Sequence, residues 1–207
     1  MSTLLLRFAA PLQAWGTESK YDIRKTDREP SKSGIVGFLA AALGRKRDES
    51  VEDLNALRVG VRADQEGEII QDFHMVHKDE KTSYLTRRYY LSDAVFVVGV
   101  ESEDDAVLQK LVDAVKNPVF PLFLGRCSCP PCGPIVLGIR EFDLETALDK
   151  EPWQIPEWRR KRETSVPCLR KVIESDSGGV VRKDRAISFI IESTVIEVLR
   201  KVYVVRS

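Results

Sequence analysis

Basic and aromatic side chains alternate in three stretches of the chain that lack the periodicity of a buried helix or strand. They are residues 13–32, residues 77–90 and the loop that begins at residue 123, and their members include Trp15, Tyr21, Arg24, Lys32, Arg87, Arg88 and Arg126. Aromatic rings that stack on bases, beside cations that pair with phosphates, are typical of proteins that hold single-stranded RNA. The pattern therefore predicts RNA binding, with solvated surface charge and a few core aromatics as the alternative.

The start of a helix at residues 30–44 (PSKSGIVGFLAAALG) is a second candidate site. Its leading proline and serine hydroxyls favour a helix start, and its last glycine favours a helix end. Free N–H groups at a helix N-terminus attract anions, and Lys32, Ser33 and Gly34 surround this one. The stretch predicts a phosphate site, and an ordinary buried, well-capped helix is the alternative.

Two histidines, His74 and His77, are the chain's candidates for an imidazole general base. They lie three residues apart, next to Lys78 and close to several tyrosines. A histidine, a lysine and a tyrosine around a scissile phosphate would make a metal-independent endoribonuclease. Alternatively, the histidines stack on bases or cap the sheet. The sequence contains no phosphate-binding P-loop, nucleophile elbow or zinc-protease motif.

Three of the four cysteines, Cys127, Cys129 and Cys132, form a C-x-C-x-x-C pattern, and Cys168 is a possible fourth ligand. Structural zinc sites commonly use C-x₂₋₄-C pairs, which this spacing matches imperfectly. We expect a structural loop with free thiols and no metal or other cofactor, with a zinc site as the alternative.

The composition is that of a globular domain: 207 residues, 43% hydrophobic and 31% charged, with a formal net charge of +0. The charge is uneven, because residues 20–47 hold eight Lys and Arg against three acids and residues 157–171 hold six against two. Local basic patches suit a nucleic-acid partner without requiring one. No apolar run has the length of a membrane span and no signal peptide is evident, so we expect a cytoplasmic protein without a membrane partner.

The elements that must position these residues follow a recognisable order. Strands are expected at 4–9, 57–63, 69–76, 94–100 and 135–139, the second and third as a hairpin, with helices at 30–44, at 51–57 and from Ser102 to residue 117. This order indicates an α+β fold of the ferredoxin-like, split β-α-β type found in many RNA-binding modules. We predict a ferredoxin-like domain at 1–143, with a projecting arm at about 77–88, and a linker plus small β-rich subdomain at 144–207.

Four ordered motifs resemble the fifth Cas family as it occurs in type I-E CRISPR systems, the CasD proteins of the RAMP superfamily. They are LRFAAPLQAWG at 6–16, the helix at 30–44, DFHMV at 72–76 and FLGRCSCP at 123–130, and two further segments fit at 88–93 and 200–205. The resemblance covers essentially the whole chain. It implies an RRM-like palm with a thumb at the arm, and a subunit of Cascade, the crRNA-guided surveillance complex of antiviral defence.

The resemblance also implies a non-catalytic role, in which the subunit grips the crRNA 5′ handle, caps the backbone filament and contacts the large subunit. Target DNA would be contacted only indirectly. We expect contacts to bases from Trp15, Tyr21 and His74, contacts to phosphates from Arg24, Lys32, Arg87, Arg88 and Arg126, and hydroxyl and N–H donors from Ser33 and Gly34.

Two alternatives stay open. One is a metal-independent endoribonuclease that processes repeat RNA, as in type I-C relatives, using His74 or His77, Lys78 and a tyrosine. The other is a pure assembly subunit whose basic patches meet acidic protein partners.

Overall fold

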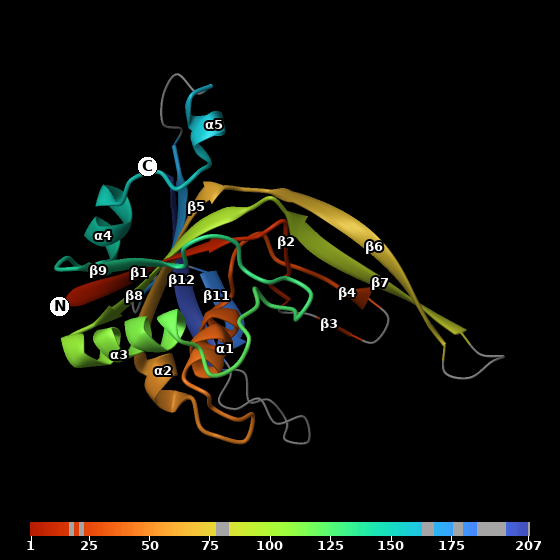
Figure 1. The fold of residues 1–207 in the computed structure, drawn as a ribbon, viewed down its shortest axis with the longest axis horizontal. Coiled ribbons are helices and arrows are strands. Elements are labelled where there is room, and N and C mark those ends of the chain that lie inside the picture. The colour runs from red at the N-terminus through yellow and green to blue at the C-terminus, as the bar shows by residue number, and fades with distance from the viewer. Residues whose placement is uncertain are drawn as a thin grey trace.

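The computed structural model describes residues 1–16, 19–20, 23–77, 83–162, 168–175, 180–185 and 198–206 (Figure 1). These residues form an α+β fold with two β-sheets, as the sequence predicts at this level. The larger sheet is antiparallel, with the order β11 (Val180–Arg185), β12 (Val198–Arg206), β10 (Arg170–Glu174), β5 (Arg58–Gln65), β8 (Val95–Ser102), β1 (Ser2–Ala9) and β9 (Val136–Arg140). The smaller sheet holds β2 (Leu12–Gln13), β3 (Ser19–Lys20), β4 (Ile23–Arg24), β6 (Glu68–His77) and β7 (Ser83–Ser92).

Helices pack on both faces of the larger sheet, and the side chains of β1 point alternately to one face and the other. Leu4, Leu6 and Phe8 face the main core with α1 (Lys32–Ala42), α2 (Glu52–Ala56) and α3 (Asp105–Lys116). Leu5 faces a second core with α4 (Leu144–Lys150), on the other side of the sheet. Each of these leucines is fully buried. Figure 1 shows α1, α2 and α3 together below the sheet and α4 above it.

Several predicted elements are confirmed. β8 is buried between β5 and β1, as a central strand should be. The buried stripe of α3 consists of Leu108, Leu111, Val112 and Val115, as its spacing predicts. The N-cap of α3 is Asp104, two residues after the serine at which we expected the helix to begin.

The expected hairpin between residues 57–63 and 69–76 is wrong. Both edges of β5 are occupied, by β8 and β10, so β6 has no free edge to join there. Instead β6 pairs along its whole length with β7, from Glu68 opposite Ser92 to His77 opposite Ser83. The result is a long arm, the β6–β7 hairpin, which projects from the body in Figure 1, and β2 and β4 pair with β7 near its base. It begins well before residue 77.

The C-terminal strands continue the larger sheet. β10 pairs with β5 on one side and with β12 on the other, and β11 pairs with β12. The domain boundary expected at residue 143 therefore does not coincide with a break in the sheet. In the part of the chain that the structure describes, no helix is long and apolar enough to cross a membrane.

Candidate nucleic-acid interface

The start of α1 satisfies its own polar groups. The Ser31 hydroxyl is the N-cap and accepts a hydrogen bond from the Gly34 N–H at 3.2 Å, and it lies 3.2 Å from the Ser33 hydroxyl. The donor that we expected Gly34 to offer a phosphate is therefore used inside the protein. Ser33 is half-buried and faces the groove described below. At the other end, Gly44 has a φ of 78°, as a helix-ending glycine should.

Lys32 is held inside the protein in this structure, which argues against the phosphate contact predicted for it. Its side chain is 2% exposed, and its ammonium donates to both carboxylate oxygens of Glu174 at 2.7 Å and to the Leu57 carbonyl at 2.9 Å. The reason is its place on the helix: Lys32 shares the inward face with Ile35 and Val36, one turn further on. The ion pair joins α1 to β10.

Trp15 is also a core residue, at the edge of the groove described below, and its burial argues against the stacking on a base predicted for it. The indole is 1% exposed and stacks on the Phe8 ring, with centroids 5.8 Å apart and an interplanar angle of 8°. Its N–H donates to the Gln13 side-chain oxygen at 3.0 Å. The apolar strand before it draws the ring into the core, which a basic and aromatic pattern alone does not reveal.

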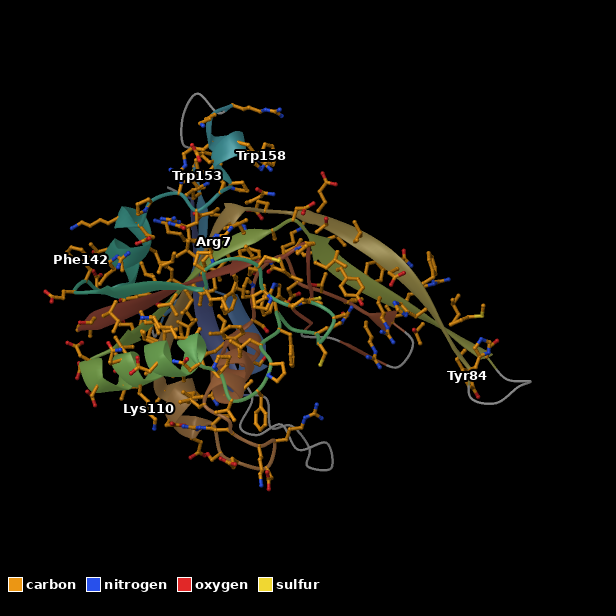
Figure 2. All side chains as sticks on the ribbon, in the orientation of Figure 1. Arg7, Tyr84, Lys110, Phe142, Trp153 and Trp158 are labelled. Carbon is orange, nitrogen blue, oxygen red and sulfur yellow. The ribbon has the colours of Figure 1, made fainter. Side chains whose placement is uncertain are left out.

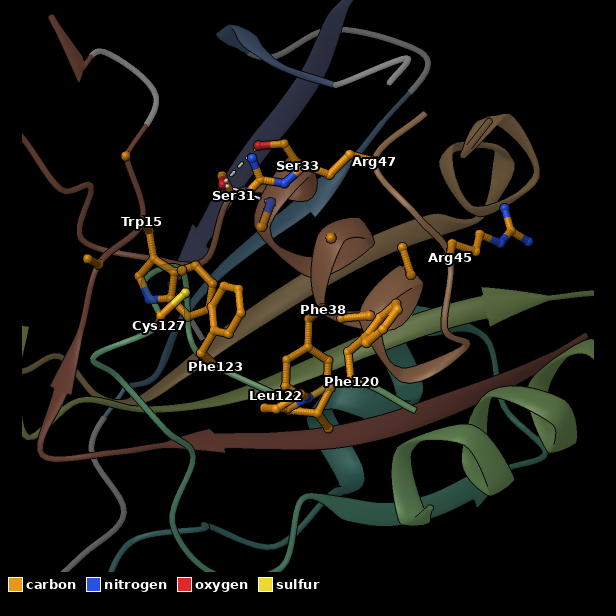
Figure 3. A pocket seen from close by; sticks show the side chains of 18 of the residues that line it. Trp15, Ser31, Ser33, Phe38, Arg45, Arg47, Phe120, Leu122, Phe123 and Cys127 are labelled. Carbon is orange, nitrogen blue, oxygen red and sulfur yellow. Dashed lines mark hydrogen bonds between the residues drawn. The ribbon is translucent and has the colours of Figure 1, made fainter. Parts of the chain in front are cut away.

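A groove of about 1030 Å³ runs between α1 and the loop that follows α3 (Figure 3). Its aromatic lining includes Phe38, Phe120 and Phe123, and Phe120 is 41% exposed. Exposed Lys46 and Arg47 line it as well. Aromatic faces beside cations that are open to solvent fit an unpaired base and its phosphate.

Arg45 also lines the groove, but it is held by the chain. Its guanidinium pairs with both carboxylate oxygens of Asp53 and donates to the Ser50 carbonyl at 2.8 Å. The hydrogen bond to Asp53 raises the pKa of Arg45 and lowers the pKa of Asp53. This pair fixes the segment that carries Lys46 and Arg47.

The opposite wall of the groove is the cysteine-containing loop, which is irregular, as predicted. Gly125 has a φ of 88°, and a Cβ there would lie 1.7 Å from the Ala14 carbonyl oxygen, so only glycine fits. Cys129 is buried, and burial raises the pKa of its thiol. Among the described residues, no group of three or more His, Cys, Asp and Glu side chains is placed to hold a metal ion.

Arg126 braces the loop against the arm. Its guanidinium donates to the Tyr89 carbonyl at 3.1 Å and to the Arg24 carbonyl at 3.0 Å, and it lies 4.8 Å from the Tyr90 ring centroid. Burial alone would raise the pKa of Tyr90, but hydrogen bonds from Ser128, Arg126 and Arg88 outweigh it and lower that pKa. The phosphate contact expected of Arg126 stays a prediction.

One face of the smaller sheet gathers three of the predicted RNA contacts. In the strand register, Arg88 on β7 lies opposite Arg24 on β4 and opposite Asp72 on β6, so the three side chains share one face. His74, two residues after Asp72, is on that face as well. His74 is 44% exposed, and its Nε2 lies 2.5 Å from an Asp72 carboxylate oxygen. The Nε of Arg88 is buried and has no hydrogen-bond partner among the described residues.

Arg87 lies on the opposite face, with Phe73 directly across from it. His77 is on that face too, because it is three residues from His74. The two histidines therefore cannot serve one catalytic site on the arm. The expected contacts of Tyr21 and Lys78 lie outside the described residues.

Sequence reasoning missed the groove. Its aromatic wall comes from α1 and from a Pro-rich loop more than eighty residues later, which no local pattern connects. The available signal was the basic run at residues 45–47, directly after the helix.

The fold and the groove are those of an α+β protein with a surface suited to single-stranded nucleic acid. Comparison with known families shows which family it belongs to. Residues 3–203 match the family model for CRISPR-associated protein (Cas_Cas5), so the chain belongs to the Cas5 family. The chain is 35% identical to the CRISPR system Cascade subunit CasD of Escherichia coli (strain K12) over an alignment 161 residues long, which covers 66% of this chain and 70% of that protein.

Two solved structures share the fold over 99% of this chain. A structure described as the crystal structure of a Cas protein is 41% identical, with a TM-score of 0.78 over 94% of its own chain. A chain of a CRISPR RNA-guided surveillance complex is 27% identical, with a TM-score of 0.77 over 90% of its length.

Proposed function

We propose that this protein is the crRNA-binding subunit of a Cascade complex, which holds the 5′ handle and caps the backbone without cleaving RNA. The observation that carries the proposal is the likeness to CasD and to a chain of an RNA-guided surveillance complex, in a chain whose groove joins aromatic faces to open cations. Its partners are then the crRNA and the other Cascade subunits, in the cytoplasm, with target DNA contacted only indirectly.

The finer architecture that we propose is a ferredoxin-like RAMP palm with the β6–β7 hairpin as its thumb. The strand order β5–β8–β1–β9, with α1 and α3 on one face, supports the palm. The length of the hairpin beyond the sheet supports the thumb.

In this account the handle follows the groove and then the arm. Phe120 and Phe123 stack on bases, while Lys46 and Arg47 pair with phosphates. Arg88, Arg24 and His74, which share one face of the smaller sheet, contact the part of the handle that follows the arm. Lys32 and Trp15 hold the frame on which these residues stand.

The proposal is tested with labelled RNA that carries the repeat-derived 5′ handle from the organism's own CRISPR array. Binding is measured by fluorescence anisotropy over a range of salt, in excess chelator. A Lys46→Ala, Arg47→Ala variant should bind more weakly, with the slope of log affinity against log salt reduced by about 0.7 for each phosphate that the variant no longer neutralises. A variant with Lys110→Ala and Lys116→Ala, two exposed lysines of α3, is the matched charge control.

Phe120→Ala should lower handle affinity by about 5- to 100-fold if the ring stacks on a base. If neither groove variant differs from the α3 control, the groove is not the handle site. A denaturing gel of the same reactions tests catalysis. Intact RNA supports the non-catalytic role, and one discrete cut that His77→Ala or His74→Ala abolishes would overturn it.

A further inference from the structure

A second basic and aromatic surface lies on α5 (Glu157–Arg160) and the two residues after it. This surface, the Trp158 patch, comprises Trp158, Arg159, Arg160, Lys161 and Arg162. No residue of α5 is buried, and Trp158 is 61% exposed. Figure 2 shows Trp158 on α5, far along the molecule from Tyr84 at the tip of the arm. Nothing in the proposed handle site uses this patch.

The patch stands on a well-held base. The buried Arg62 donates to the Glu151 carbonyl at 2.7 Å, which fixes the chain as it leaves α4. The Trp153 indole donates to the Asp64 carbonyl at 2.9 Å, and Arg160 donates to the Trp153 carbonyl at 2.6 Å. These bonds hold the chain on both sides of Trp158, and a surface whose backbone is already held loses less freedom when a ligand arrives.

The two neighbouring tryptophans differ in what they do. Trp153 uses its indole N–H inside the protein, whereas the Trp158 ring faces solvent with the Arg162 guanidinium 5.5 Å from its centroid. Lys161 pairs with Glu157 at 2.9 Å, but both side chains are more than 70% exposed, so the pair is weak and leaves the cation available. Among the described residues 157–162, four basic side chains and one acid flank Trp158 in sequence, and the Arg162 guanidinium lies over its ring.

The Trp158 patch lies on the other face of the larger sheet from the groove. Along β5, Val59, Val61 and Ala63 pack into the core that includes α1, so Arg62 and Asp64 point to the opposite face, where they hold the base of α5. A nucleic acid on the Trp158 patch is therefore a different segment from one that fills the groove.

We propose that the Trp158 patch binds single-stranded nucleic acid, RNA or DNA, without reading its sequence. The Trp158 ring stacks on one unpaired base, and the Arg162 guanidinium enlarges the stacking surface. Arg159 and Lys161 pair with the phosphates on either side of that base. An acidic protein that covers the indole is the competing occupant, and the assembly measurement below separates it from nucleic acid. This inference goes beyond handle binding and does not depend on it.

The test uses the full-length protein and labelled 20-nucleotide oligomers that lack the handle: poly(U) RNA, poly(dT) DNA and a DNA duplex. Affinity is measured by anisotropy across salt. Trp158→Ala should weaken binding of both single strands by about 5- to 100-fold, and Trp158→Phe should restore most of it. A Lys161→Glu, Arg162→Glu variant should flatten the salt slope, whereas Lys110→Glu, Lys116→Glu, with the same change of charge on α3, should do so less.

Comparison of the two single strands and the duplex identifies the ligand. Loss confined to RNA or to DNA names the strand that the patch prefers, and Trp158→Ala should leave duplex binding unchanged because paired bases offer no stacking partner. If the patch variants bind every oligomer as the α3 control does, the proposal is overturned. If they keep oligomer binding but no longer assemble with the other Cascade subunits, the patch is a protein interface and the proposal is also overturned.

Discussion

Replacing Lys32 with methionine separates a structural role from an RNA-binding role at the position that sequence reasoning placed in the phosphate site. The Lys32 side chain is 2% exposed, and its ammonium donates to the Leu57 carbonyl and to both carboxylate oxygens of Glu174, whose side chain is 17% exposed. Breaking a buried ion pair by removing one partner costs about 3–5 kcal/mol, because the other charge is left without its partner. Glu174 keeps the Val59 N–H at 3.2 Å, so we expect the lower end, about 3 kcal/mol.

The assay is urea unfolding followed by circular dichroism. With a slope of about 2–3 kcal/mol per molar urea, a loss of this size lowers the unfolding midpoint by about 1–1.5 M. Lys110→Met, at an exposed position on α3, should change the free energy of unfolding by less than about 0.5 kcal/mol. Adding Glu174→Leu to Lys32→Met should recover part of the loss, because no buried charge then lacks a partner.

Handle RNA supplies the decisive comparison for Lys32. Under conditions in which Lys32→Met is fully folded, its RNA affinity and salt slope should equal those of the wild type. A variant that loses less than about 1 kcal/mol of stability and yet binds RNA more weakly would refute the reasoning, since Lys32 would then act on the ligand and not on the fold.

Four further predictions concern other contacts in the structure. Asp104→Ala should cost about 1 kcal/mol of unfolding free energy and Asp104→Ser much less, measured in urea, because the Asp104 carboxylate accepts the Ala106 N–H at 2.8 Å. Gly34→Ala should cost about 1–3 kcal/mol in the same assay, since its Cβ would lie 2.9 Å from a buried indole carbon; no loss would contradict this packing. Arg126→Met should raise the pKa of Tyr90, read from phenolate absorbance, because it removes a hydrogen bond that lowers that pKa; an unchanged titration would contradict the contact. The folded-state pKa of Asp53 lies below its ordinary value of 3.8, so its pair with Arg45 stabilises the fold above that value and loses this effect as pH falls through the folded pKa. Asp53→Asn should therefore remove a small acid-dependent part of the stability, below about 1 kcal/mol because Asp53 is 61% exposed.

The elements that sequence predicted correctly are those whose pattern is local. In α3 and β8 the spacing of apolar residues within the element itself predicts which side chains are buried. Strand pairing is not local. The partner of β6 depends on whether β5 has a free edge, and that depends on β10, more than a hundred residues later.

The same limit applies to the site. Lys32 and Trp15 match an RNA-binding pattern in residue type, but Glu174 and Phe8 draw them inward, and Glu174 is 142 residues from Lys32. The residue type determines which interactions a side chain can make. Its burial determines whether the partner is another part of the protein or a ligand. The groove could not be predicted for the same reason. Phe120 and Arg47 are far apart in the sequence and line one groove only in the folded chain.

Cross-linking of handle RNA to the assembled complex tests the central claim most directly. The handle is synthesised with 4-thiouridine at successive positions, irradiated in the complex and mapped by mass spectrometry of the attached peptides. Handle binding in the groove predicts cross-links to peptides that contain residues 38–47 and 120–130, with further sites on the β6–β7 hairpin. Cross-links confined to other subunits, or to surfaces of this chain away from the groove and the hairpin, would contradict it.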